Sequence, residues 1–196
     1  MILIAGDSFT AETKFPIWHD HLINPKHKRI NLASSNAGNL YIGESVKRLL
    51  TSKVRACLLM WSEMDRLDVP NDKKKSSLAT PYGGKIWNHY GTMASGKGKS
   101  DWKRLGYEKV VEMNIESITS THRALDNKDI PYAYSFISNN DLIPQHLKAK
   151  AIQPFLGNFA QERGMLQEDN YHANVDAHLQ WSNMIKPQIT FMDVIS

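Results

Sequence analysis

The sequence is poor in cysteine and contains no long hydrophobic run. Its single cysteine, Cys57, excludes an internal disulfide, and the thiol lies in the apolar run VRACLLMW, where a small buried hydrophobe is expected. No apolar stretch approaches the roughly 18 residues of a membrane-spanning helix. The first residues, MILIAGDS, lack the basic head and long apolar stretch of a signal peptide. We therefore expect no membrane partner and a cytoplasmic location.

The net charge is also small over most of the chain. The 196 residues carry a net charge of +4, but residues 71–104 alone contain eight basic and two acidic residues, a net charge of +6. Because the rest of the chain is slightly acidic, the overall basicity does not indicate nucleic-acid binding. With 41% hydrophobic and 22% charged residues, the composition is that of a folded globular protein, and the length predicts one domain over residues 1–196.

Short apolar runs alternate with amphipathic segments along the chain. Strands are predicted at 2–6, 29–33, 54–61 and 132–137. Helices are predicted at 39–51, 107–125 and 177–186. This alternation predicts an α/β fold in which a central parallel sheet lies between two layers of helices. The sequence of residues 140–175 indicates helix but no fifth strand.

Residues 68–104 are too long and too rich in glycine for a connector, so we interpret them as a basic insertion beside the functional site. Trp87, Tyr90 and Lys97 in this insertion are candidate substrate-binding residues, because aromatic faces combined with cations suit sugars, bases or anionic polymers. The alternative is a solvated flap whose aromatic side chains only pack it down.

Ser8 is the first candidate for chemistry. It follows the first predicted strand by two residues, and ligands of parallel sheets bind beyond the carboxyl ends of the strands. The surrounding GDSFT lacks the second glycine of a GxSxG elbow, which argues against the α/β-hydrolase arrangement. A structural alternative is that Ser8 only caps a helix or turn.

GDSFT resembles block I of the SGNH, or GDSL, hydrolases, and later segments fall in the order of that family. NLASSNAGNLYI looks like block II, WSEMDR occupies the place of block III, and VDAHLQW looks like block V. The resemblance covers most of the chain and is nearest to lean, phage-encoded members. It implies a flavodoxin-like three-layer α/β/α fold, serine esterase activity and no cofactor.

The resemblance also implies roles for individual residues. Ser8 would be the nucleophile, His178 the base and Asp176 the acid that holds the base. Oxyanion donors would come from Gly38 or the slot at Asn36, and from Ser62 in block III, where the family normally has Asn. The family usually places two residues between its terminal Asp and His, whereas one residue separates Asp176 from His178. The implied substrate is a small ester or an acylated glycan, such as an O-acetylated or anionic carbohydrate.

Two other interpretations stay open at this point. The missing block III Asn suits a catalytically weakened module of the same fold that binds glycan or is a structural part of a virion. A metal site would need two clusters to converge: His19, Asp20, His21 and His172, Asp176, His178. Because FPIWHDHLI is interpreted as helix, His19 and His21 would point apart, and we expect no metal. His178 could also merely cap the last helix.

Overall fold

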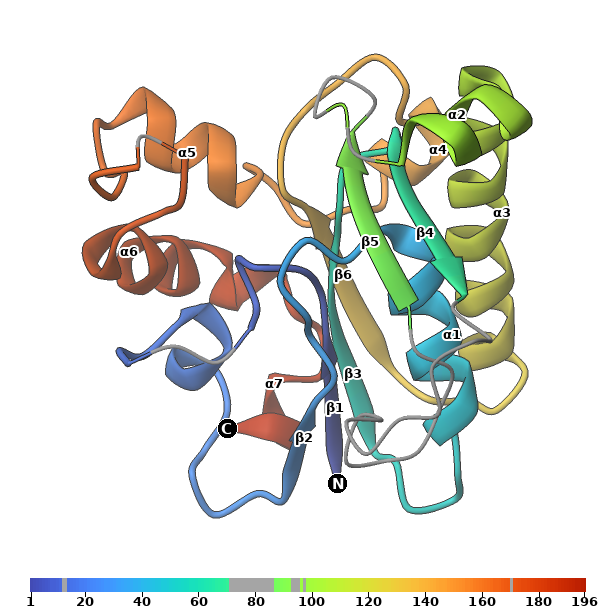
Figure 1. Cartoon of the computed structure of the whole chain (residues 1–196). Coiled ribbons are helices and arrows are strands. Elements are labelled where there is room, and N and C mark those ends of the chain that lie inside the picture. Colours follow the sequence, from blue (N-terminus) through green and yellow to red (C-terminus); the bar gives the residue numbers. More distant parts are fainter. Residues whose placement is uncertain (12–13, 71–86, 93–95, 97, 170) are drawn as a thin grey trace.

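The computed structural model describes residues 1–11, 14–70, 87–92, 96, 98–169 and 171–196. A four-stranded parallel sheet with the strand order β2-β1-β3-β6 forms its centre (Figure 1). The strands are β1 (Ile2–Ala5), β2 (Arg29–Asn31), β3 (Ala56–Trp61) and β6 (Tyr132–Phe136). Leu3 of β1 is in register with Ile30 of β2 and Cys57 of β3, and Leu59 of β3 with Tyr134 of β6. The four predicted strands and their parallel pairing are confirmed.

Helices and turns cover both faces of this sheet, which explains why the sequences of β1 and β3 are continuous apolar runs. Side chains alternate between the faces, so Ile2 and Ile4 enter one hydrophobic cluster while Leu3 and Ala5 enter another. Cys57 is fully buried in the second cluster, and burial raises the pKa of its thiol to about 12. This cysteine is a core residue, as predicted.

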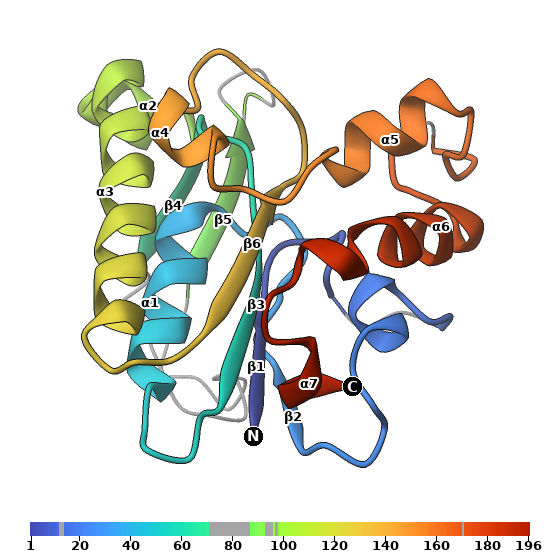
Figure 2. The ribbon, with the colours of Figure 1, turned by 180° about the vertical axis from the view of Figure 1, so that it is seen from behind.

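The helices on one face of the sheet are α1 (Asn39–Leu49), α3 (Tyr107–Asp126) and α4 (Gln145–Lys148) (Figure 2). α1 and α3 approach closely at Gly43, where an added Cβ would lie 2.6 Å from Thr121 Oγ1. Trp61 of β3 donates its indole N–H to His122 Nε2 of α3 at 3.2 Å. His122 is therefore a buried structural residue, which agrees with its place beside the apolar stripe of the helix.

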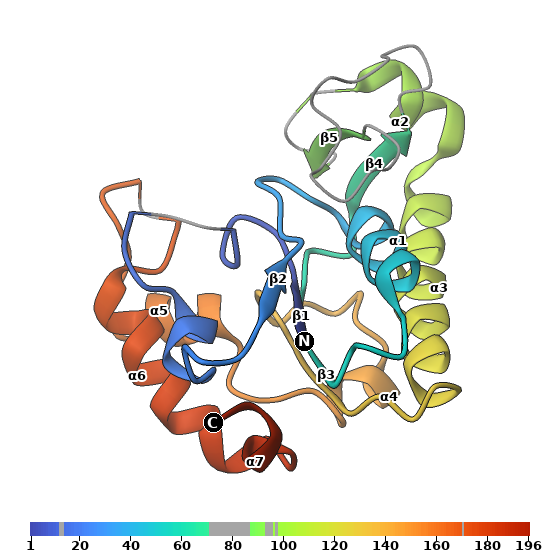
Figure 3. The same ribbon diagram turned by 90° about the horizontal axis from the view of Figure 1, so that it is seen from below.

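The opposite face is covered by the two ends of the chain (Figure 3). The elements there are the 3-10 turns η1 (Trp18–His21) and η3 (Lys186–Gln188) and the helices α5 (Leu156–Glu162), α6 (Val175–Ile185) and α7 (Met192–Ile195). Trp18 of η1 and Trp181 of α6 meet edge to face, with ring centroids 5.7 Å apart. FPIWHDHLI, predicted as a helix, contains only the single 3-10 turn.

The described part of the insertion forms a small antiparallel sheet and a helix. The strands are β4 (Arg66–Pro70) and β5 (Trp87–Thr92), and the helix is α2 (Lys99–Leu105). This unit lies over α1 and the start of α3, and Leu67, Trp102 and Val110 form a small core of their own beneath it (Figure 1). None of the helices within the described ranges is long and apolar enough to cross a membrane.

Candidate active site

Ser8 lies in the turn that leaves the carboxyl end of β1. Gly6 begins this turn where a side chain has no room, because a Cβ there would lie 2.7 Å from Thr10 Cβ. The buried Asp7 then fixes the turn: its Oδ1 accepts the Phe9 amide and its carbonyl accepts the Thr10 amide, both at 3.0 Å. The Ser8 amide donates no hydrogen bond to any residue that the structure describes. A free N–H therefore accompanies the Ser8 hydroxyl at this edge of the sheet.

A short loop between α5 and α6 brings an imidazole and a carboxylate to the same edge. The Gln167 amide donates to the His172 carbonyl at 2.7 Å, which closes the base of the loop. At its tip, Asp169 Oδ1 accepts the backbone amides of Tyr171 and His172, each at 2.9 Å. The Asp169 side chain thus folds the tip back on itself and faces the His172 ring.

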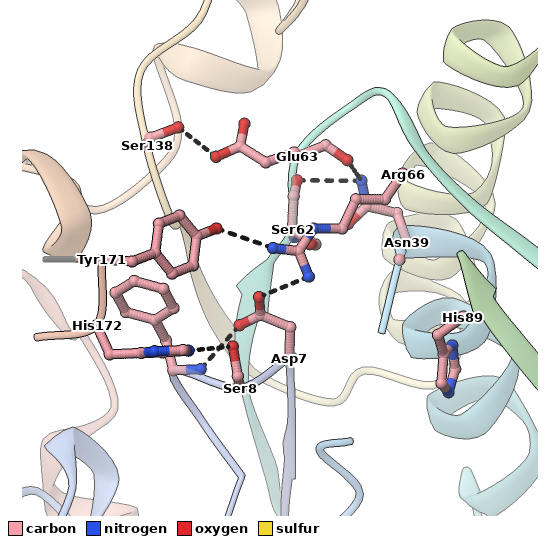
Figure 4. A network of polar contacts seen from close by, with 12 residues as sticks. Asp7, Ser8, Asn39, Ser62, Glu63, Arg66, His89, Ser138, Tyr171 and His172 are labelled. Carbon is pink, nitrogen blue, oxygen red and sulfur yellow. Dashed lines mark hydrogen bonds and ion pairs between the residues drawn. The ribbon is translucent and has the colours of Figure 1, made fainter. Parts of the chain in front are cut away.

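Ser8, His172 and Asp169 form a continuous series of hydrogen bonds, of which Figure 4 shows the contact between His172 and Ser8. His172 Nε2 lies 2.9 Å from Ser8 Oγ, and His172 Nδ1 lies 2.5 Å from Asp169 Oδ2. An ionised carboxylate only accepts hydrogen bonds, so Nδ1 carries the proton and Nε2 is left to accept the Ser8 hydroxyl. This is the arrangement in which an imidazole can take a proton from a serine.

The carboxylates of Asp169 and Asp7 have pKa values that are shifted in opposite directions. Hydrogen bonds from the His172 ring and from two backbone amides lower the pKa of Asp169 to about 2, so this residue is ionised at neutral pH. Complete burial instead raises the pKa of Asp7 to about 6, although the Arg66 guanidinium works in the opposite direction. Asp169 is therefore the group that holds the imidazole, while Asp7 belongs to the turn.

The structure corrects the predicted base and acid. His178 is on the buried side of α6, only 3% exposed, and its Nδ1 accepts the Trp18 amide at 3.3 Å. Burial lowers the pKa of His178 to about 4. Asp176 lies exposed in the first turn of the same helix. No contact within the described ranges joins either residue to Ser8, because VDAHLQW is the start of a helix packed on the core and not a loop.

The predicted oxyanion residues are mostly engaged elsewhere. The Gly38 amide donates to Asp68 Oδ1 at 2.9 Å, because Asp68 of β4 caps the start of α1. Asn36 is exposed and has a left-handed backbone, with φ of 61°. The Ser62 amide donates to Asn39 Oδ1 at 2.7 Å, and its buried hydroxyl has no hydrogen-bond partner within the described ranges. Within those ranges, neither the Asn36 amide nor the Ser8 amide donates a hydrogen bond.

Two of the three predicted substrate-binding residues of the insertion, Trp87 and Tyr90, lie among the described residues, and no contact within those ranges joins either of them to Ser8. Trp87 lines a pocket of about 440 Å³ between α1 and α3 and meets the edge of the Tyr41 ring. Tyr90 packs against the small core beneath β4 and β5. Lys97 is outside the described residues. The contacts described for these two aromatics are packing contacts, and a role for them in substrate binding stays a prediction.

The sequence prediction missed His172 and Asp169 as a pair, although the spacing for it was present. Asp169 and His172 are separated by two residues, the spacing that the SGNH family usually has and that Asp176 and His178 lack. The metal interpretation did name His172. Within the described part of the chain, no group of three histidine, cysteine or acidic side chains is arranged to hold a metal ion.

Comparison with known proteins adds no name to this site. The chain matches no family model and no curated protein. Any function must therefore be argued from the residues themselves.

Two buried histidines lead to a prediction for stability against pH. Burial lowers the pKa of both His122 and His178 from 6.5 to about 4. Since the unfolded chain binds these protons more readily, the free energy of unfolding should fall as the pH falls from about 6.5 to about 4. Each histidine should contribute on the order of 2 kcal/mol to this loss. Asp7, with its raised pKa, acts in the opposite sense over the same range.

The measurement compares urea unfolding of the wild type and a His122→Gln, His178→Asn double variant at pH 4.5 and pH 7. Gln can place its carbonyl oxygen near the position of Nε2, which accepts from Trp61, and Asn can do so for Nδ1, which accepts from Trp18. The double variant should lose much less stability between the two pH values than the wild type. Equal losses in both proteins would contradict the assignment.

Proposed function

We propose that this protein is a serine hydrolase of the SGNH type that cleaves an ester. The observation that carries the proposal is the series of hydrogen bonds from Asp169 through His172 to Ser8. The order of the strands, with β1 and β3 at the centre of a parallel sheet, supports the flavodoxin-like type that we propose, in which ligands bind at the carboxyl edge. The Asp169 to His172 spacing adds a second point of agreement with the family that GDSFT resembles.

In this mechanism Ser8 Oγ attacks the carbonyl carbon of the ester while His172 Nε2 takes its proton. Asp169 keeps the imidazole in the required tautomer and stabilises the imidazolium that forms. The free Ser8 amide donates to the oxyanion of the tetrahedral intermediate. His172 then gives the proton to the leaving alcohol, and water removes the acyl group from Ser8 by the same steps.

The surroundings of Asp169 bear on the substrate. A pocket of about 640 Å³ opens beside it, and its lining includes Phe15, Val175 and the carboxylates of Glu168 and Asp169. Acidic groups disfavour an anionic substituent at this position. We therefore propose a neutral acyl ester, such as an acetyl group on a carbohydrate, in preference to an anionic one.

A glycan-binding module without catalysis is the second candidate. The observation that favours it is the engagement of the Gly38 and Ser62 amides, which leaves a hydrolase with fewer oxyanion donors than the family has. Such a module would keep the fold and the surface but would not activate Ser8.

A phosphonofluoridate separates the two candidates, because it forms a covalent adduct only with an activated serine. The wild type should gain the mass of one phosphonyl group, located on Ser8 by peptide mapping. Ser8→Ala should take no label, and Ser138→Ala, at the same edge of the sheet, should label like the wild type. An unlabelled wild type at every pH from 6 to 9 would leave the binding module as the better proposal.

A further inference from the structure

Arg66 is a buried arginine that spans the gap between the two halves of the candidate site (Figure 4). Its side chain is 6% exposed. Nη2 donates to the Tyr171 hydroxyl at 2.9 Å, and Nη1 lies 3.2 Å from Asp7 Oδ2. The resemblance to SGNH hydrolases gave no role to this residue, which follows WSEMD as the first residue of β4.

The two partners of Arg66 are the chain neighbours of the nucleophile and of the base. Asp7 precedes Ser8, and Tyr171 precedes His172. The Tyr171 ring also meets Phe9, the residue after Ser8, edge to face with centroids 5.6 Å apart. One guanidinium therefore ties the turn after β1 to the loop that carries the imidazole.

The backbone of Arg66 is itself held firmly. Asn114 of α3 donates its side-chain amide to the Arg66 carbonyl at 2.9 Å, and the Arg66 amide donates to the Glu63 carbonyl at 3.3 Å. By contrast, the loop with the base is open to solvent, with side-chain exposures of 32% for His172 and 47% for Asp169. The start of β4, held by these hydrogen bonds, can therefore anchor the exposed loop that carries His172.

We propose that Arg66 is a positioning residue that holds the loop of His172 against the turn of Ser8 through the Tyr171 hydroxyl. Its consequence for catalysis rests on the proposed function. If Ser8 and His172 are nucleophile and base, a misplacement of about 1 Å between them can lower the rate about a hundredfold. A lysine could not replace it, because one ammonium on a flexible stem lacks the planar fork that reaches two partners at once.

The first test needs no catalysis. The amides of Tyr171 and His172 both donate to Asp169 Oδ1, so their hydrogen exchange reports how often the loop opens. Tyr171→Phe removes the hydroxyl but keeps the ring on Phe9. Exchange of both amides, corrected for intrinsic rates, should become about tenfold faster, as expected for the loss of one hydrogen bond to a charged group.

Arg66→Lys supplies a second variant that keeps a positive charge opposite the buried Asp7, so that folding is preserved. It should accelerate exchange of the same amides, and the double variant with Tyr171→Phe should exchange no faster than the single variants. Tyr134→Phe, which removes a hydroxyl that donates to the Leu147 carbonyl elsewhere in the fold, and Arg104→Lys at an exposed ion pair serve as matched controls. Neither control should change exchange in the loop.

The second test follows ester hydrolysis by the same proteins. Arg66→Lys and Tyr171→Phe should each lower kcat about tenfold or more and change KM less than about twofold, because alignment of His172 and Ser8 is lost and not substrate contact. Unchanged exchange in both variants, or additive effects in the double variant, would overturn the positioning role. Faster exchange in the two variants, together with a wild type that hydrolyses no ester, would instead support the positioning role and reject the proposed function.

Discussion

Replacing Ser8 by alanine is expected to lower kcat for hydrolysis of a short aryl ester by at least about three orders of magnitude. The physical reason is that, in the proposed mechanism, Ser8 Oγ is the atom that forms the acyl bond, and alanine leaves no hydroxyl beside His172 Nε2. The effect should fall on kcat and leave KM nearly unchanged, since the hydroxyl adds little to ground-state binding. Ser138→Ala, which removes a hydroxyl bonded to Glu63 at the same edge, should retain wild-type kinetics.

The decisive comparison for this prediction is the Ser8→Ala, His172→Ala double variant. Nucleophile and base act in one step, so once either is absent the other has little left to contribute. The double variant should therefore be little slower than Ser8→Ala alone. Multiplicative effects of the two changes, or more than about a tenth of wild-type activity in Ser8→Ala, would contradict the assignment of the nucleophile.

The sheet and the position of Ser8 could be predicted because their signals are local. β1 and β3 are buried on both faces, and strands of this kind have continuous apolar sequences that can be recognised without a structure. The position of Ser8 follows from them, because the residues that come directly after a central parallel strand lie at the carboxyl edge of the sheet.

The choice of the base failed on the boundary of one helix. His172 and His178 are six residues apart, and each follows an aspartate closely. Asn174 accepts the Ala177 amide at 2.9 Å and starts α6, so His178 falls one turn inside the helix on the face that packs against the core. The N-cap preference of asparagine was a signal in the sequence that could have placed His178 in the helix and left His172 in the loop.

The oxyanion donors and Arg66 could not be predicted, because their contacts are long-range. The Gly38 amide is satisfied by Asp68, thirty positions away in a strand of the insertion. Arg66 meets Asp7 and Tyr171, which are far from it in the chain in opposite directions. No local sequence pattern predicts these contacts, since they depend on how β4 packs against α1.

The base is tested by the contrast between His172→Ala and His178→Asn. His172→Ala removes the acceptor of the Ser8 proton and should lower kcat by at least about three orders of magnitude, with little change in the free energy of unfolding, because the ring is on an exposed loop. His178→Asn should leave kcat and KM within about twofold of the wild type, since the His178 ring accepts the Trp18 amide in the core and makes no bond to Ser8 within the described residues.

The free energy of unfolding should change in the opposite order, so that His178→Asn is the more destabilised of the two variants. His178 is buried at the packing of η1 against α6, so His178→Asn should lower the free energy of unfolding at pH 7 by about 1–3 kcal/mol, even though Asn can still accept the Trp18 amide. Kinetics on an aryl ester and urea unfolding of the same two preparations separate the roles. A His178→Asn variant that unfolds like the wild type but has lost its activity would restore His178 as the base, because the ring would then matter for the reaction and not for the core.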